Sequence, residues 1–183
     1  MADLSDAYMK LNVCSSTAQR LFTVAEQVPN DYWVTYYNFK ALPIPKETLL
    51  DEPLIADLVS VFPDLHTGVL KMEPNTCYNW HTDTDRAVGI NMRLNDAPSH
   101  CWFTQNSDKL TTDVREIDYE LGRYYVFNTK IPHIVFNGDK PRYLFSLELL
   151  GDHRGVTFDE LCATLRGMNY GNREKSLSNP SGY

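Results

Sequence analysis

The sequence lacks the features of membrane proteins and of nucleic-acid-binding proteins. No apolar run approaches the ~20 residues that a membrane-spanning helix needs, so we expect no membrane partner. The formal net charge is −7, which argues against the basic face of a nucleic-acid-binding protein, so no nucleic-acid partner is expected. The sequence also shows no internal repeat and no sign of a second domain.

The four cysteines are scattered and form no C-x-x-C pair. No signal peptide is recognisable, and an even number of cysteines does not then indicate disulfides. We therefore expect four reduced thiols and a cytoplasmic location. Cys77 and Cys101 fall in predicted strands without the spacing of zinc ligands, so we interpret them as buried, small apolar side chains.

The length of 183 residues allows one substantial hydrophobic core and is too short for two. Hydrophobic residues make up 43% of the chain, as in an ordinary globular domain, and the 11 Tyr, 8 Phe and 3 Trp favour a β-rich core. We expect a single domain over residues 1–183.

Two helices are predicted in the first 66 residues, with one aromatic strand between them. The first spans residues 17–28, where Ser16 and Gln19 form an S-x-x-Q capping box and Pro29 ends the helix. The strand spans residues 31–40. The second helix spans residues 52–62, with Asp51 as N-cap and Pro53 in its first turn. Residues 1–66 are thus expected to form a helical cover.

From residue 67 onward the pattern changes to short β runs, separated by clusters of Gly, Pro, Asn and Asp. The predicted strands span residues 67–72, 77–81, 87–94, 100–104, 114–119, 122–128, 131–136 and 142–150. A parallel sheet would need crossover helices between them, and none fit. The pattern is typical of a jelly-roll or cupin-like double sheet over residues 67–150. In residues 151–183, Thr157 and Glu160 predict a capped C-terminal helix, followed by a polar tail.

The most informative motif is His81–Thr82–Asp83, together with His133 some fifty residues later in the chain. Residues i and i+2 of an extended segment point to the same side, with Cα atoms roughly 6.6 Å apart. Two imidazoles and one carboxylate are the three ligands that hold a non-haem Fe(II) and leave coordination positions open. The sequence therefore predicts an iron site at His81, Asp83 and His133.

Arg142 opens a predicted strand nine residues after His133. A guanidinium group binds a carboxylate through two parallel hydrogen bonds, as a keto-acid co-substrate beside the iron would require. Alternation along this strand puts Arg142, Leu144, Ser146 and Glu148 on one side and Tyr143, Phe145, Leu147 and Leu149 on the other. If Arg142 faces the interior of the double sheet, the aromatic side must pack beneath the N-terminal helices.

The predicted strand 87–94 alternates in the same way. Val88, Ile90, Met92 and Leu94 form an apolar stripe, opposite Gly89, Asn91 and Arg93. One interpretation is that Asn91 and Arg93 line the cavity and contact the co-substrate or the substrate. The alternative is that both are ordinary solvent-facing residues of a half-buried strand.

These residues together resemble the Fe(II)/2-oxoglutarate-dependent oxygenases. Residues 78–86 look like the first metal-binding segment of that superfamily, and residues 122–149 look like the second. The pattern His133-x-Val135-x-Asn137 with Arg142 nearby is most similar to the aspartyl/asparaginyl β-hydroxylase-like branch. The similarity covers roughly residues 67–150.

The resemblance implies a double-stranded β-helix, Fe(II) at the three predicted ligands, and 2-oxoglutarate bound by Arg142. It also implies a hydroxylase that uses O2 to oxidise an unactivated C–H bond and releases succinate and CO2. Ser146 or Tyr78 would be a hydroxyl partner for the far carboxylate of 2-oxoglutarate. Arg86 either binds an anionic substrate group or neutralises a neighbouring aspartate. The substrate would be an amino acid, a short peptide or another small molecule, and the sequence does not indicate an oligomeric state.

Two other classes of protein stay open. A cupin that binds a metal for other chemistry usually has His-x-His and a further Glu in its first motif. Here Asp83 takes the second position and no Glu follows at short spacing, which counts against a cupin of that kind. A non-enzymatic jelly-roll binding module would carry structural histidines, and would show neither iron affinity nor succinate formation from 2-oxoglutarate.

Overall fold

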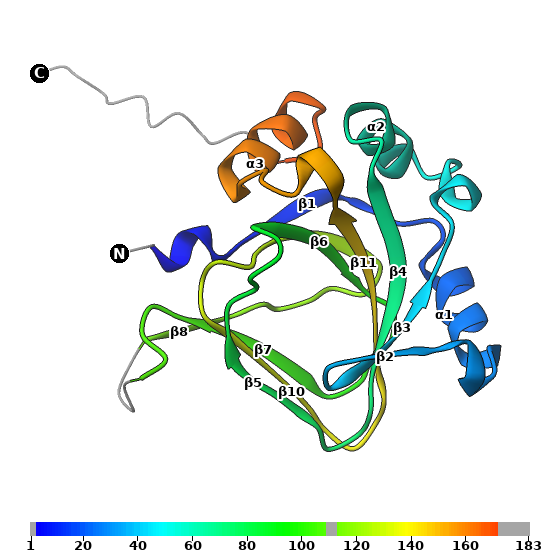
Figure 1. The fold of residues 1–183 in the computed structure, drawn as a ribbon, viewed down its shortest axis with the longest axis vertical. Coiled ribbons are helices and arrows are strands. Elements are labelled where there is room, and N and C mark those ends of the chain that lie inside the picture. Colours follow the sequence, from blue (N-terminus) through cyan, green and yellow to red (C-terminus); the bar gives the residue numbers. More distant parts are fainter. Residues whose placement is uncertain (1–2, 109–112, 172–183) are drawn as a thin grey trace, which may run out of the picture.

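A computed structural model of the chain describes residues 3–108 and 113–171. Within these residues, two antiparallel sheets face each other, and the helices lie outside the larger sheet (Figure 1). The larger sheet has the strand order β1 (Tyr8–Cys14), β9 (Arg123–Asn128), β6 (Val88–Arg93), β11 (Arg142–Leu149), β4 (Leu65–Met72), β3 (Phe39–Pro43) and β2 (Val34–Tyr36). The smaller has the order β5 (Cys77–His81), β10 (His133–Asn137), β7 (Ser99–Thr104) and β8 (Val114–Glu116).

The predicted β-rich double sheet, a double-stranded β-helix, is confirmed. Each of the eight predicted strands is present, and most agree within two residues at either end. The exception is β8, which ends at Glu116 instead of residue 119. Beyond that point Ile117 leaves the ladder, although its N–H still donates to the carbonyl of Cys101 at 3.1 Å.

The predicted inside and outside faces of β11 are confirmed. The outward-facing side chains of this strand belong to one hydrophobic core with the buried faces of α1 (Ala18–Gln27), α2 (Pro53–Val61) and α3 (Phe158–Gly167). Phe22 of α1 packs edge-on against Tyr143, with ring centroids 5.4 Å apart. Because neighbouring residues of a strand point to opposite faces, Arg142 points into the space between the two sheets.

The predicted capping of the first two helices is wrong. The N-cap of α1 is Thr17, whose side chain makes no capping hydrogen bond, and Ser16 Oγ donates to the buried carboxylate of Glu52 at 3.2 Å. Glu52, not Asp51, is the N-cap of α2, and Asp51 pairs with Arg20 at 3.3 Å. Contacts between the two helices therefore replace the local caps that the sequence pattern favours.

The predicted aromatic strand over residues 31–40 is also wrong, because β2 and β3 form a hairpin there. The turn is made by Tyr37, which has a positive φ of 50°, and by Asn38, whose Nδ2 donates to the carbonyl of Cys77 at 3.0 Å. The hairpin tip is thereby tied to β5 of the opposite sheet. A further strand, β1, was not predicted, so the first 66 residues supply more than a helical cover.

The C-terminal helix is present as predicted, including its capping box. Thr157 Oγ1 accepts from the N–H of Glu160 at 3.3 Å, and Glu160 Oε2 accepts from the N–H of Thr157 at 2.8 Å. The polar tail predicted after it lies outside the described residues from residue 172 onward. Among the described helices, none combines the length and apolar character needed to cross a membrane.

We expect Thr157→Ala to lower the free energy of unfolding by about 0.5–2 kcal/mol, because the first turn of α3 loses a side-chain acceptor. Urea titration followed by circular dichroism measures this difference. Thr164→Ala is the matched control, since Thr164 lies within the same helix and takes no part in its cap. An equal loss in both variants would contradict the assigned cap.

Candidate metal centre and co-substrate pocket

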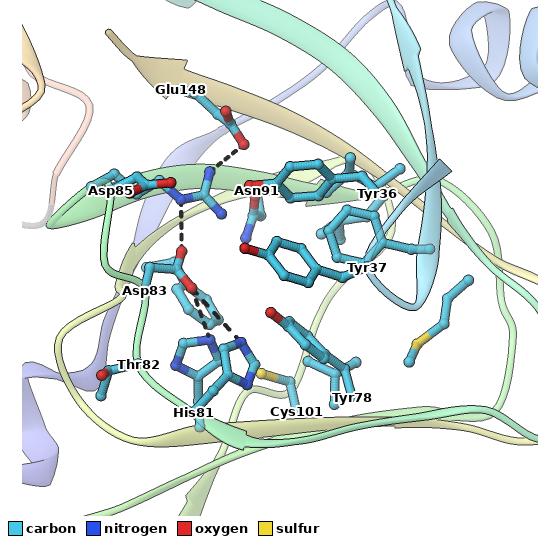
Figure 2. A pocket seen from close by; sticks show the side chains of 18 of the residues that line it. Tyr36, Tyr37, Tyr78, His81, Thr82, Asp83, Asp85, Asn91, Cys101 and Glu148 are labelled. Atoms are coloured by element: carbon cyan, nitrogen blue, oxygen red, sulfur yellow. Dashed lines mark hydrogen bonds and ion pairs between the residues drawn. The ribbon is translucent and has the colours of Figure 1, made fainter. Parts of the chain in front are cut away.

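A cavity of about 420 Å³ opens between the two sheets (Figure 2). Its volume lies within the range of roughly 300–1,000 Å³ that is usual for small-molecule sites. His81, Asp83 and His133 line one part of its wall, and Asn91, Tyr119 and Arg142 line another. Both sheets therefore contribute to one site, with its polar groups turned toward the interior.

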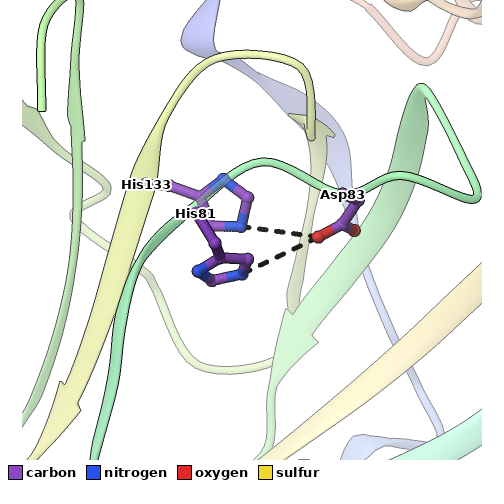
Figure 3. Close-up of side chains that lie close together, drawn as sticks. All are labelled: His81, Asp83 and His133. Carbon is purple, nitrogen blue, oxygen red and sulfur yellow. Dashed lines mark ion pairs between the residues drawn. The ribbon is translucent and has the colours of Figure 1, made fainter.

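The three predicted metal ligands converge in this cavity (Figure 3). Nε2 of His81 lies 3.7 Å from Oδ1 of Asp83, and Nε2 of His133 lies 3.9 Å from the same oxygen. All three donor atoms lie within 4.8 Å of one another. Neighbouring ligands of one ion, bound at about 2.0–2.2 Å each, lie about 3 Å apart, so small side-chain movements suffice to enclose a metal.

Both imidazoles are already in the tautomer that metal binding needs. Nδ1 of His81 lies 2.6 Å from the carbonyl oxygen of Asn79, and Nδ1 of His133 lies 3.0 Å from that of Ile131. A carbonyl oxygen only accepts, so each Nδ1 carries the proton and each Nε2 offers its lone pair to the cavity. A hydrogen bond from the other ring nitrogen to a backbone carbonyl fixes the orientation of a metal-binding histidine.

The three metal ligands are brought together by strand pairing and by a loop, and not by strand alternation alone as the sequence predicted. His81 is the last residue of β5 and is the direct cross-strand partner of His133 on β10. Asp83, however, lies beyond the end of β5, so strand alternation does not position it. Its N–H donates to the carbonyl of Thr129 at 3.0 Å, which ties the loop after β5 to the connection between β9 and β10.

Burial, and secondarily the neighbouring His81, lowers the pKa of His133 to about 4. In the unfolded chain a histidine titrates near 6.5. Between these values the unfolded state takes up a proton that the folded state does not, so stability falls as the pH falls through this window. His133 is therefore neutral, as a metal ligand must be, at any pH above about 5.

We expect this titration to remove about 2 kcal/mol from the unfolding free energy of the metal-free protein between pH 7 and pH 5. Urea unfolding in the presence of a chelator at both pH values measures the change. The variant His133→Gln lacks the titrating group and should lose less stability over the same interval. Equal losses in the variant and the natural protein would contradict this assignment.

Arg86, for which the sequence left two interpretations, neutralises Asp83. Its Nε donates to Oδ2 of Asp83 at 2.7 Å, and its Nη1 forms an ion pair with Oε1 of Glu148 on β11. No ion pair to Asp85 occurs within the described part of the chain. Both ends of the guanidinium group are thus bound to protein carboxylates, which leaves little of it for an anionic substrate.

Arg142 is buried, lines the cavity and has no counter-ion among the described residues. Its Nε makes no hydrogen bond there, although the atom is inaccessible to solvent. The guanidinium carbon lies 5.7 Å from the centre of the Tyr119 ring, the usual range of a cation–π contact. A buried charge without a partner is costly, so this arrangement is expected where a ligand brings the missing negative charge.

Two further buried polar atoms lie in the same part of the cavity wall. Oη of Tyr119 and Oδ1 of Asn91 make no hydrogen bond of good geometry to any described residue, although the two side chains lie near each other. Burial raises the pKa of Tyr119, so its hydroxyl stays protonated and able to donate. Tyr119 was not among the site residues predicted from the sequence, although its position at the end of a predicted strand could have indicated it.

Of the other candidate residues, Tyr78 lines the cavity, whereas Ser146 and Arg93 do not. Tyr78 lines the cavity with its ring against His81, with centroids 3.8 Å apart. Ser146 is buried on the same strand face as Arg142 and has an unpaired Oγ, but it is not among the residues that line the cavity. Arg93 turns away, because its Nε donates to the carbonyl of Asn95 at 2.8 Å and its Nη2 pairs with Asp96. The predicted ligand contact of Arg93 is therefore corrected to a structural role in that loop.

The two cysteines of the predicted strands differ in their surroundings. Cys101 is buried and lines the cavity, and burial raises the pKa of its thiol to about 12. It therefore stays protonated and is not a thiolate ligand. Cys77 is exposed, so its interpretation as a buried apolar residue is wrong.

Aromatic side chains of the β2–β3 hairpin form a further part of the wall, which the sequence did not predict as part of a site. Tyr37 stacks on Tyr78 with ring centroids 5.9 Å apart, and Tyr36 packs edge-on against Tyr37 at 4.7 Å. Figure 2 shows the hydroxyl ends of Tyr37 and Tyr78 turned toward the centre of the cavity. Because the hairpin tip is held by Cys77, these rings close one side of the cavity.

Solved structures with the same fold include 2-oxoglutarate-Fe(II) oxygenases. A prolyl-4-hydroxylase of Pseudomonas putida aligns with 12% identity over 77% of this chain and 90% of its own, with a TM-score of 0.58. A prolyl hydroxylase of Trichoplax adhaerens, in complex with a peptide fragment of hypoxia inducible factor, aligns with 17% identity over 79% and 83%, with a TM-score of 0.58. HygX of Streptomyces hygroscopicus, with nickel and 2-oxoglutarate bound, aligns with 10% identity over 77% and 81%, with a TM-score of 0.52.

The chain shares the fold of these enzymes. At such identities the likeness concerns the fold alone, and the chemistry must be argued from the site itself. No protein-family model and no curated protein sequence matches the chain.

Proposed function

We propose that the protein is an Fe(II)/2-oxoglutarate-dependent dioxygenase that hydroxylates an unactivated C–H bond. The observation that carries the proposal is the combination, in one cavity, of the His81–Asp83–His133 cluster with the buried Arg142, which has no counter-ion among the residues that the structure describes. A metal site alone would fit several classes of protein. A metal site facing a buried cation without a counter-ion fits a metal enzyme with a dicarboxylate co-substrate.

Fe(II) held by the three ligands, with 2-oxoglutarate and O2, supplies the oxidising chemistry and yields succinate and CO2. The protein's own part is to bind and to orient. His81 and His133 present Nε2 in a fixed tautomer, and Asp83 adds a negative charge that partly offsets the charge of the ion. With only three protein ligands, the metal would keep positions for the co-substrate and O2.

Arg142 would bind the far carboxylate of 2-oxoglutarate through two parallel hydrogen bonds. Tyr119 and Asn91 would complete the site, the first as a hydroxyl donor and the second through its amide group. This arrangement would satisfy the unpaired Nε of Arg142 and the unpaired hydroxyl of Tyr119. Ser146, which the sequence also indicated, lies beside Asn91 in the strand pairing and could support its orientation.

The part of the cavity near Tyr36, Tyr37 and Tyr78 would receive the primary substrate. Its aromatic walls and phenol hydroxyls suit an amino acid, a short peptide or another small molecule with both apolar and polar parts. The peptide bound in the Trichoplax adhaerens structure makes a peptidyl substrate a reasonable first choice for a screen. The proposed setting is the reducing cytoplasm, in agreement with four free cysteines.

The finer placement in the aspartyl/asparaginyl β-hydroxylase-like branch rests on the His-x-Val-x-Asn pattern. Asn137 of this pattern is buried, and its Nδ2 donates to the carbonyls of Met72, Glu73 and Lys140 at 3.1, 2.9 and 2.8 Å. The asparagine therefore holds the connection between β10 and β11 and does not contact the cavity. The His-x-Val-x-Asn pattern therefore supports a β10–β11 connection built as in that branch, and it gives less support to a substrate shared with that branch.

The test is anaerobic titration with Fe(II), followed by titration with 2-oxoglutarate, and then succinate measurement after O2 is admitted. We expect one iron per chain, 2-oxoglutarate binding that depends on the metal, and slow succinate formation that a substrate accelerates. A panel of amino acids and short peptides identifies the substrate class. Metal binding without 2-oxoglutarate binding would favour a cupin with other chemistry, and the absence of both would favour a binding module.

A further inference from the structure

We infer that Arg86 is a positioning residue that makes Asp83 bind the metal through a single oxygen. The inference rests on the proposed function in one respect only, because it needs a metal at the His81–Asp83–His133 cluster. It assigns a role to the charged network of Asp83, Arg86 and Glu148. From the sequence, Arg86 was interpreted only as a substrate contact or as a charge that neutralises an aspartate.

The two oxygens of the Asp83 carboxylate have different partners. Oδ2 accepts from Nε of Arg86 at 2.7 Å. Oδ1 is the oxygen that lies 3.7 Å and 3.9 Å from the Nε2 atoms of His81 and His133. Figure 3 shows one oxygen of this carboxylate facing the imidazoles of His81 and His133, with the other oxygen turned away from them. One oxygen therefore faces the metal position, and the other is held away from it.

The guanidinium group is itself held firmly. Its Nη1 forms an ion pair with Oε1 of Glu148, which projects from β11. Gly89 on the neighbouring strand β6 packs closely against the guanidinium group. A Cβ atom at this position would lie only 3.4 Å from Nη1 of Arg86. The side chain of Arg86 is 22% exposed and that of Asp83 is 20% exposed, so this ion pair is shielded from solvent more than a surface pair is.

The backbone of this loop is fixed as well. Thr129, which is fully buried, donates from Oγ1 to the carbonyl of Arg86 at 2.8 Å and accepts from the N–H of Asp83 at 3.0 Å. Lys130 donates from Nζ to the carbonyl of Asp83 at 2.8 Å. The segment that carries Asp83 and Arg86 is thus bound to the segment that leads to His133.

The consequence concerns the number of open positions on the metal. A carboxylate that is free to rotate can bind a metal through one or both oxygens. The proposed reaction needs three open positions, two for 2-oxoglutarate and one for O2. A second bond from Asp83 would take one of them. By holding Oδ2, Arg86 keeps Asp83 to one position and fixes the angle from which it approaches.

The experiment uses Mn(II) as the probe metal on the full chain, without 2-oxoglutarate. Metal affinity and the number of exchangeable waters on Mn(II), from water-proton relaxation, are measured for the natural protein and for Arg86→Met. Arg154→Met is the matched control, because Arg154 also lines the cavity and, in the described structure, forms no ion pair with His81, Asp83 or His133. We expect Arg86→Met to bind Mn(II) about 10- to 100-fold more weakly and to hold fewer waters, whereas the control keeps both values.

Arg86→Lys should recover part of the affinity, because a single ammonium group cannot pair with Asp83 and Glu148 in the same fixed geometry. Glu148→Gln leaves Arg86 in place, and should shift both values in the same direction by a smaller amount. It serves as the second test should Arg86→Met fail to fold. Unchanged affinity and unchanged water number in the folded Arg86 and Glu148 variants would overturn the inference. Failure of the natural protein to bind Mn(II) or Fe(II) would instead reject the proposed function.

Discussion

Arg142→Ala should weaken the binding of 2-oxoglutarate by roughly 30- to several-thousand-fold. Truncating one partner of a charge-assisted pair in a desolvated site costs on the order of 2–5 kcal/mol, at about 1.4 kcal/mol per tenfold in affinity. Arg142 meets the condition for a large effect, because it is buried and lacks any other counter-ion among the described residues. Iron affinity should change little, because the three metal ligands are untouched.

The two affinities are separable by anaerobic titration, first with Fe(II) and then with 2-oxoglutarate. Arg142→Lys should recover only part of the loss, because an ammonium group replaces a planar fork of donors. Arg154→Ala removes the same charge from the exposed edge of the cavity and should leave 2-oxoglutarate affinity nearly unchanged. Unaltered 2-oxoglutarate binding in Arg142→Ala would reject the co-substrate assignment.

Tyr119→Phe is a smaller change in the same pocket, because it removes one hydroxyl group and keeps the aromatic ring against Arg142. We expect 2-oxoglutarate affinity to fall by about tenfold, the effect of losing one hydrogen bond to a charged group, worth about 1.5 kcal/mol. The same titration measures it. An affinity equal to that of the natural protein would remove Tyr119 from the binding site and leave Arg142 and Asn91.

The strands were predictable from the sequence because each carries its own local signal. Alternation of apolar and polar residues, interrupted by Gly, Pro and Asn, marks short antiparallel strands without reference to the rest of the chain. The same alternation assigned the two faces of β11 correctly, because the side chain of Arg142 and the ring of Tyr143 must point in opposite directions. The burial of that aromatic face beneath α1 followed from the lack of any other apolar cover.

The failures occurred where distant contacts override local preference. Ser16 has the sequence pattern of an N-cap, but its hydroxyl instead donates a hydrogen bond to the buried carboxylate of Glu52. The turn at Tyr37 has no Gly or Pro to mark it, and its strained conformation is supported by contacts of the hairpin tip with β5. Neither effect is visible in a window of neighbouring residues.

The metal ligands illustrate both cases. The chemistry of two histidines and an aspartate is readable from the sequence, and so is the convergence of His81 with the distant His133. The orientation of Asp83 is not, because it depends on Thr129 and Arg86, which act through the folded backbone and a carboxylate on another strand. A motif therefore indicates which residues converge, and the surrounding contacts decide how each donor atom is presented.

Asp83→Ala should abolish turnover and weaken iron binding by more than about 100-fold, since even the loss of an outer partner of a metal ligand costs about 10- to 100-fold. Asp83 is the sole carboxylate of the cluster, so its removal leaves two neutral imidazoles for a divalent ion. Asp85→Ala is the matched control, because it removes the same charge from the same loop without touching the cluster. Fe(II) affinity is measured anaerobically, and succinate formation is measured with saturating 2-oxoglutarate.

The same substitution also changes the surroundings of Arg86, which keeps Glu148 as its one carboxylate partner within the described residues. Part of any lost metal affinity could then come from a rearranged loop. Asp83→Asn separates the two effects, because its amide oxygen can still face the metal while the ligand charge is gone. We expect Asp83→Asn to retain the thermal stability of the natural protein more closely than Asp83→Ala does, and to bind Fe(II) nearly as poorly. Strong Fe(II) binding by Asp83→Asn would show that geometry, not charge, is what Asp83 contributes, and strong binding by both variants would reject Asp83 as a ligand.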